Sequence, residues 1–129
     1  EVYAGDTPTL RITAGEREAK HEREAQALDR LYAEMKDLVW APAMVACYER
    51  QDTPEARFVY ALDKLLPKTT HLLNGGAVLR AEGAGREELT LTYKEQAERL
   101  ASYFDEFPVL GQLYRFLSAA VLDLELEGL

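Results

Sequence analysis

Apolar side chains recur at helical intervals along most of the chain, and this period constrains the fold more than any other feature. Between residues 16 and 36, for example, Ala25, Leu28, Tyr32 and Met35 form one apolar stripe of a helix. Alternation of apolar and polar residues, the pattern of a half-buried strand, never extends beyond a few positions. We therefore predict an all-α fold, a helical bundle in which residues 1–129 form a single domain.

Residues with known preferences for helix ends mark the predicted boundaries. The Thr-Pro pair at 53–54 suits the start of a helix, and Asn-Gly-Gly at 74–76 suits its end. Thr92 and Glu95 have the spacing of a capping box, which predicts a helix start after an exposed connection at 77–91. The predicted helices span residues 16–36, 38–50, 53–73, 92–107 and 108–124.

The charge and the cysteine content exclude several classes of protein. The 129 residues carry 15 Lys and Arg against 23 Asp and Glu, a net charge of −8. This balance argues against nucleic acid polymers and membranes as partners, because both attract basic surfaces. No apolar run reaches the ~20 residues that cross a bilayer. The single cysteine, Cys47, cannot form an intramolecular disulfide and fits a reducing, cytoplasmic location.

One acidic residue, Asp63, falls where the predicted 53–73 helix is apolar. Asp disfavours helix interiors, and a buried carboxylate is costly unless a cation compensates it. Pro67 adds a second irregularity, since it lacks the N–H that would bond the carbonyl of residue 63. Two interpretations stay open: Asp63 binds a metal or acts in catalysis, or it pairs with Lys64 or a neighbouring element at the edge of the stripe. Its neighbours one turn away are Val59, Tyr60, Leu66 and Pro67.

Other conspicuous side chains have simpler interpretations. The large residues Trp40, Met44 and Tyr48 are expected to point inward from the predicted 38–50 helix. Lys64 and Lys68 could each contact a phosphate, but we expect both to be solvated.

The residues around Asp63 resemble a known sequence pattern. Residues 55–64, Glu-Ala-Arg-Phe-Val-Tyr-Ala-Leu-Asp-Lys, are similar to the late helix of HD-domain metal phosphohydrolases, in particular their 5′-deoxynucleotidase-like branch. Residues 1–8, Glu-Val-Tyr-Ala-Gly-Asp-Thr-Pro, resemble the segment that follows the His-Asp pair for which the family is named. The resemblance covers residues 1–76, and 77–129 would add a connection and two packing helices. It implies that the chain is the C-terminal portion of an HD domain.

The resemblance also implies a divalent metal ion such as Mn²⁺, Co²⁺ or Mg²⁺, with Asp63 as its last protein ligand. Glu1 would orient or deprotonate the metal-bound water, and Asp6 would lie near the substrate's phosphate and sugar. Alternatively, Glu1 is a frayed terminus and Asp6 a turn-forming residue. The family's His and His-Asp ligands would precede Glu1, and His21 and His71 do not replace them. We therefore expect this chain alone to be inactive and to hold no stoichiometric metal.

The implied function is release of phosphate from a nucleoside 5′-monophosphate or a similar small phosphate ester. Two alternatives remain: a non-catalytic helical interaction or dimerisation module, and a nucleotide-binding pseudoenzyme. Without the earlier helices, the predicted 53–73 helix would leave an apolar face open. We therefore expect the chain to form a homo-oligomer or to associate with the missing N-terminal segment.

Overall fold

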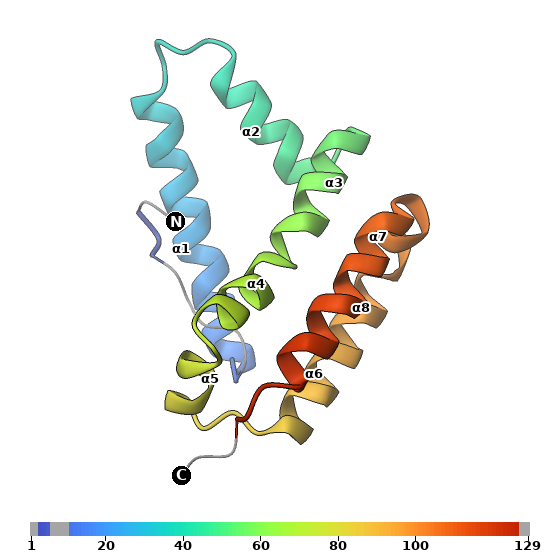
Figure 1. The fold of residues 1–129 in the computed structure, drawn as a ribbon. Coiled ribbons are helices and arrows are strands. Elements are labelled where there is room, and N and C mark those ends of the chain that lie inside the picture. Colours follow the sequence, from blue (N-terminus) through green and yellow to red (C-terminus); the bar gives the residue numbers. More distant parts are fainter. Residues whose placement is uncertain (1–2, 6–10, 127–129) are drawn as a thin grey trace. The chain divides into compact units, whose positions relative to one another are not determined.

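The computed structural model describes residues 3–5 and 11–126, and throughout these residues the chain is all-α, without a strand (Figure 1). This confirms the predicted fold class. No helix among the described residues is long and apolar enough to cross a membrane. The helices are α1 (Ala14–Glu34), α2 (Ala41–Arg50), α3 (Pro54–Asp63), α4 (Leu66–Leu73), α5 (Ala77–Ala81), α6 (Arg86–Arg99), α7 (Ala101–Glu106) and α8 (Pro108–Leu122).

The chain folds into two compact units, residues 1–49 and 50–129. In the first unit, Thr13 and Glu16 form a capping box that starts α1: the Thr13 N–H donates to Glu16 Oε2 (2.8 Å), and the Glu16 N–H donates to Thr13 Oγ1 (3.3 Å). No residue of α1 is buried, and Ala25, part of the predicted stripe, is exposed.

The predicted inward orientation of Trp40 and Met44 is wrong. Their exposed fractions are 67% and 62%, whereas Tyr48 is partly buried as expected. Trp40 precedes the first turn of α2, so it does not share the helical register from which its burial was inferred. The small residue Ala41 is the one that α2 buries.

The second unit has a core organised around α8. Leu65, Leu100, Tyr114 and Leu117 form a buried cluster that joins α4, the α6–α7 junction and α8. Within this unit, α8 packs against α4, α6 and α7 (Figure 1). Gly111 allows α8 to approach α7 closely, because a Cβ at this position would lie 3.1 Å from Cβ of Phe104.

The predicted helix over 53–73 is two helices, α3 and α4. Thr53 caps α3 as predicted, accepting a hydrogen bond from the N–H of Ala56 (3.2 Å). The last turn of α3 tightens, with the N–H of Lys64 bonded to the carbonyl of Ala61 (3.2 Å) and that of Leu65 to the carbonyl of Leu62 (2.9 Å). Pro67 then lies in the first turn of α4, where its missing N–H is not needed.

Residues 77–91 are largely helical, so the predicted connection and the predicted helix start at Thr92 are wrong. Helix α6 begins at Arg86, and Thr92 Oγ1 donates to the carbonyl of Glu88 (2.8 Å) from inside the helix. A mid-helix threonine that bonds back to its own helix has the same sequence spacing as a cap. By contrast, the predicted end at 74–76 is confirmed by φ angles of 59° and 77° at the two glycines, and α8 begins at Pro108 as predicted.

Candidate functional site

Asp63, the predicted metal ligand, is the last residue of α3 and lies at the surface. Its side chain is 52% exposed, and Oδ2 lies 3.0 Å from Lys64 Nζ. The expected burial among apolar side chains is therefore wrong. The physical reason is the helix break, which ends α3 at this residue instead of extending the apolar stripe through it. Asp63 thus makes the ion pair with Lys64 that was one of the two sequence interpretations, and its carboxylate remains accessible.

The surroundings of Asp63 combine exposed apolar and aromatic groups. Val59, one turn earlier in α3, is 50% exposed, and Leu66, the first residue of α4, is 53% exposed. Lys64 Nζ also lies 4.8 Å from the ring centroid of Tyr60, so the lysine is held between a carboxylate and an aromatic face. The Asp63 carboxylate and the Lys64 ammonium group therefore lie next to one another at the surface.

The described residues do not bring together a metal centre around Asp63. No group of three or more His, Cys, Asp or Glu side chains among residues 3–5 and 11–126 could hold a metal ion. His21 lies in α1, 3.8 Å from Glu24, and His71 lies in α4 with Nδ1 buried and without a hydrogen-bond partner among the described residues. Burial lowers the pKa of His71. Glu1 and Asp6, the other two predicted site residues, lie outside the described residues.

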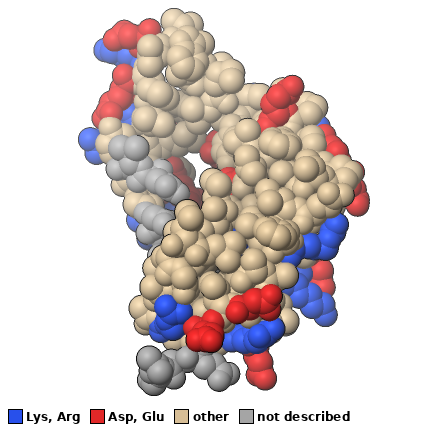
Figure 2. Space-filling view, in the orientation of Figure 1, with Lys and Arg blue, Asp and Glu red and all other residues tan. Residues whose placement is uncertain are grey.

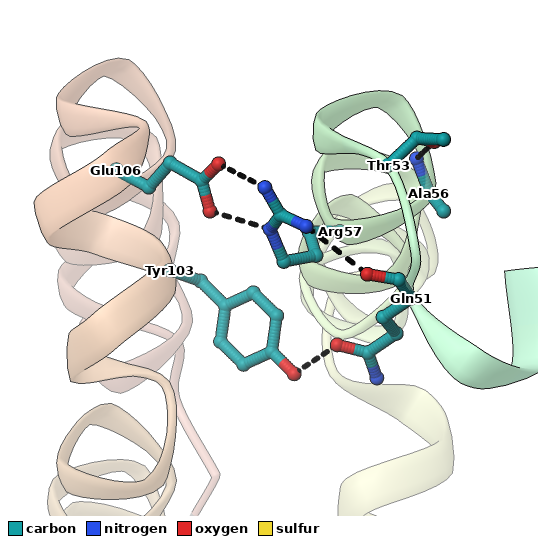
Figure 3. A network of polar contacts seen from close by, with 6 residues as sticks. All are labelled: Gln51, Thr53, Ala56, Arg57, Tyr103 and Glu106. Atoms are coloured by element: carbon teal, nitrogen blue, oxygen red, sulfur yellow. Dashed lines mark hydrogen bonds and ion pairs between the residues drawn. The ribbon is translucent and has the colours of Figure 1, made fainter.

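A polar network on the same helix was missed by the sequence analysis (Figure 3). Arg57 donates two hydrogen bonds to Glu106 of α7, from Nε to Oε2 (2.8 Å) and from Nη2 to Oε1 (2.7 Å). Its Nη1 donates to the carbonyl of Gln51 (3.0 Å), whose side chain accepts a hydrogen bond from the Tyr103 hydroxyl. Gln51 has a φ of 55°, a left-handed conformation that is costly for a residue other than glycine. The network therefore holds a strained turn and ties α3 to α7.

Arg57 and Glu106 perturb each other's titration. The hydrogen bonds from Arg57 lower the pKa of Glu106, and those to Glu106 raise the pKa of Arg57. Both side chains keep about a third of their surface exposed, at 31% and 34%. The two residues are 49 positions apart. No local spacing in the sequence indicates a contact of this kind.

Lys68, predicted to be solvated, is buried with 2% exposure. Its position could have been read from the sequence: Leu65, Lys68 and Leu72 follow one another at intervals of three and four residues, so the lysine falls on the buried stripe of α4. A charged residue on such a stripe is the signal that the sequence analysis passed over.

Charges of both signs are mixed on the surface. On the face drawn in Figure 2, basic and acidic side chains lie next to one another in several places. Exposed pairs include Arg30 with Glu34 (3.1 Å) and Arg50 with Asp52 (2.7 Å). Basic and acidic side chains are therefore paired at these two places on the surface.

Comparison with known proteins gives one family. A family model described as HD domain matches residues 1–107. No curated protein and no solved structure matches the chain. The match contains Asp63, Arg57 and Glu106, ends just before α8, and extends beyond residue 76, where the sequence resemblance was expected to fade.

Proposed function

The chain belongs to the HD-domain family, and from this premise we propose that it forms part of a metal-dependent phosphohydrolase with Asp63 as a metal-binding carboxylate. The observation that carries the proposal is the family match over residues 1–107, which includes the Asp63 motif. The accessibility of the Asp63 carboxylate at the end of α3 supports it, because a ligand must reach its ion.

The described residues alone do not fit a divalent ion, because no group of three or more His, Cys, Asp or Glu side chains among them could hold one. Divalent cations in proteins usually take several protein ligands. We propose that the others come from outside the described residues. Glu1 and Asp6 are retained as proposed catalytic residues, since a carboxylate within hydrogen-bond reach can orient a water or accept its proton.

The proposed substrate is a nucleoside 5′-monophosphate or a similar small phosphate ester, as in the 5′-deoxynucleotidase-like branch of the family. We further propose that a second copy of the chain, or an additional N-terminal segment, covers the apolar side chains beside Asp63. Support comes from Val59 and Leu66, which are about half exposed on either side of it in the sequence.

The test is a phosphate-release assay on nucleoside 5′-monophosphates with Mn²⁺, Co²⁺ or Mg²⁺ added in turn, carried out on the chain together with the segment that supplies the other proposed ligands, because the chain alone is expected to be inactive. We expect Asp63→Ala to abolish turnover and to leave the metal-free melting temperature close to that of the wild type, because the carboxylate is exposed. The matched control is Asp105→Ala, which removes an exposed aspartate of α7 and should keep full turnover. Normal turnover per folded Asp63→Ala molecule would contradict the assignment.

A non-catalytic role is the second candidate, favoured by the lack of a three-ligand group among the described residues. A pseudoenzyme would bind a nucleoside 5′-monophosphate in calorimetry and release no phosphate with any of the three metals. An interaction module would bind no nucleotide at all. In both cases Asp63→Ala would change neither measurement.

A further inference from the structure

Helix α4 places a lysine in the core of the second unit. Lys68 is 2% exposed and lies between Leu65, the N-cap of α4, which belongs to the core cluster, and Leu72, which packs against that cluster. Lysine side chains are almost never fully buried unless a carboxylate or another acceptor compensates the charge. The contacts of its ammonium group therefore decide what the residue does.

Two aromatic rings and one amide surround the ammonium group. Nζ lies 4.1 Å from the ring centroid of Tyr93 and 4.2 Å from that of Tyr114. It also donates a hydrogen bond to Gln96 Oε1 (2.5 Å). We call Lys68, Tyr93, Gln96 and Tyr114 the Lys68 cage. It joins α4 to α6 and α8.

No described carboxylate lies within ion-pair distance of the cage, although the chain as a whole is acidic. The faces of tyrosine rings attract a cation, but each such contact is modest beside the cost of removing an ammonium group from water. Burial accordingly lowers the pKa of Lys68 to about 8. The Lys68 amine therefore changes charge close to neutral pH.

The other titratable groups of the cage keep their charge in this range. Burial raises the pKa of Tyr93 and of Tyr114 to about 12. Burial also lowers the pKa of His71, the nearest titratable group on α4, and the charge of Lys68 lowers it further while Glu82 opposes both. Around pH 8 Lys68 is therefore the group of the cage whose charge changes.

We propose that Lys68 is a proton-operated switch of the packing between α4 and the α6–α8 pair. When Nζ holds its third proton, the core contains a cation without a carboxylate, and α4 is loosened from α6 and α8. Release of that proton to solvent leaves a neutral amine, which the two rings and Gln96 accommodate, and the contact tightens. Because α4 follows Asp63 after two residues, the switch acts on the segment next to the candidate site.

The first test is the pH dependence of unfolding. The pKa of Lys68 is lower in the folded than in the unfolded chain, so the unfolded chain holds more protons between the two values and stability rises with pH there. We expect the unfolding equilibrium constant of the wild type to fall about tenfold from pH 8 to pH 9.5, relative to Lys68→Met. The matched control is Lys94→Met, an exposed lysine of α6, which should keep the wild-type slope.

Two further variants separate charge from packing. Lys68→Met should have an unfolding constant at pH 7 at least about tenfold below that of the wild type, since an apolar side chain of similar length removes the buried charge. Lys68→Arg, which stays charged at every accessible pH, should unfold more readily and lack the slope. A Lys68→Met protein that keeps the wild-type slope, or that is less stable than the wild type at pH 7, would overturn the proposal.

Discussion

Helices α3 and α4 each send one cationic side chain toward the C-terminal helices, and the two are compensated in opposite ways. Arg57 of α3 meets the carboxylate of Glu106 through two parallel hydrogen bonds and stays about a third exposed. Lys68 of α4 is buried and contacts two tyrosine rings and the side-chain amide oxygen of Gln96. The difference follows from burial: near water a carboxylate partner costs little, whereas in the core it would add a second charge to desolvate.

The two contacts also respond to pH in different ranges. Glu106 gains protons in acid, so the Arg57 contact weakens when the pH falls. Lys68 loses a proton above neutrality, so its contact strengthens when the pH rises. The second unit therefore contains two contacts between helices, Arg57–Glu106 and the Lys68 cage. The first changes with pH in acid and the second above neutrality.

The largest effect should come from Gln96, because its side-chain amide oxygen accepts the hydrogen bond that Lys68 donates in the cage. We expect Gln96→Leu to lower the free energy of unfolding at pH 7 by ~3 kcal/mol, since it leaves a buried ammonium group without that partner. In the Lys68→Met background the same change should cost less than about 1 kcal/mol. Urea unfolding of the four proteins measures both values.

The Tyr114 hydroxyl provides the internal check on this cycle. It lies 2.7 Å from the carbonyl of Tyr93 and 3.0 Å from Gln96 Oε1, and its one proton can serve only one of them at a time. Loss of Gln96 therefore leaves Tyr114 satisfied. An equal cost of Gln96→Leu with and without Lys68 would show that the amide supports packing and not the charge.

A smaller effect is expected at the strained turn at Gln51, which Arg57 and Tyr103 contact. Tyr103→Phe removes the hydroxyl that donates to Gln51, and we expect it to cost about 1 kcal/mol. The cost should vanish in the Gln51→Gly background, because this change removes the acceptor of that bond and lets the backbone adopt its positive φ freely. Thermal unfolding of the single and double variants measures the coupling, and purely additive losses would contradict this expectation.

Local chemistry explains which parts of the fold could be predicted. Thr53, the glycines at 75 and 76, and Pro108 act on the backbone beside them, so their helix ends were predicted where they occur. The helix start predicted at Thr92 was wrong because a threonine three residues before a glutamate can either cap a helix or bond back to a carbonyl within one. The sequence pattern of residues 55–64 pointed to the HD-domain family, which the comparison confirmed.

The site was harder to predict because it depends on packing. Asp63 was expected to be buried because one continuous helix was assumed across Pro67, and the break turns its side chain outward. The Arg57–Glu106 contact joins residues 49 positions apart, and no local period encodes such a pairing. The burial of Lys68 could be predicted only in part. Its position on the apolar stripe follows from the sequence, but the tyrosine rings that permit its burial come from α6 and α8.

The smallest effect, and the sharpest test of the comparison, concerns Glu106 in acid. Because the Arg57 fork lowers the pKa of Glu106 below its ordinary value of 4.5, its contribution to stability is present above that value and is lost as the pH falls through the lower, folded value. We expect Glu106→Gln to lower the urea midpoint slightly at pH 7, by less than Tyr103→Phe does. The difference from the wild type should shrink as the pH is lowered from about 5 to 3.

Glu106→Gln also tests whether the Arg57–Glu106 contact and the Lys68 cage are independent. In an Arg57→Met background, Glu106→Gln should leave the stability between pH 5 and 3 unchanged, since the two hydrogen bonds from Arg57 to Glu106 are already lost. It should also leave the rise between pH 8 and 9.5 intact, because that rise belongs to Lys68 on the other helix. Independence is expected since the two contacts share no residue and meet α3 and α4 on either side of the break at Lys64 and Leu65. If Glu106→Gln changed the rise in stability between pH 8 and 9.5, the Arg57–Glu106 contact would influence the Lys68 contact. The two contacts would then be energetically coupled across the break between α3 and α4.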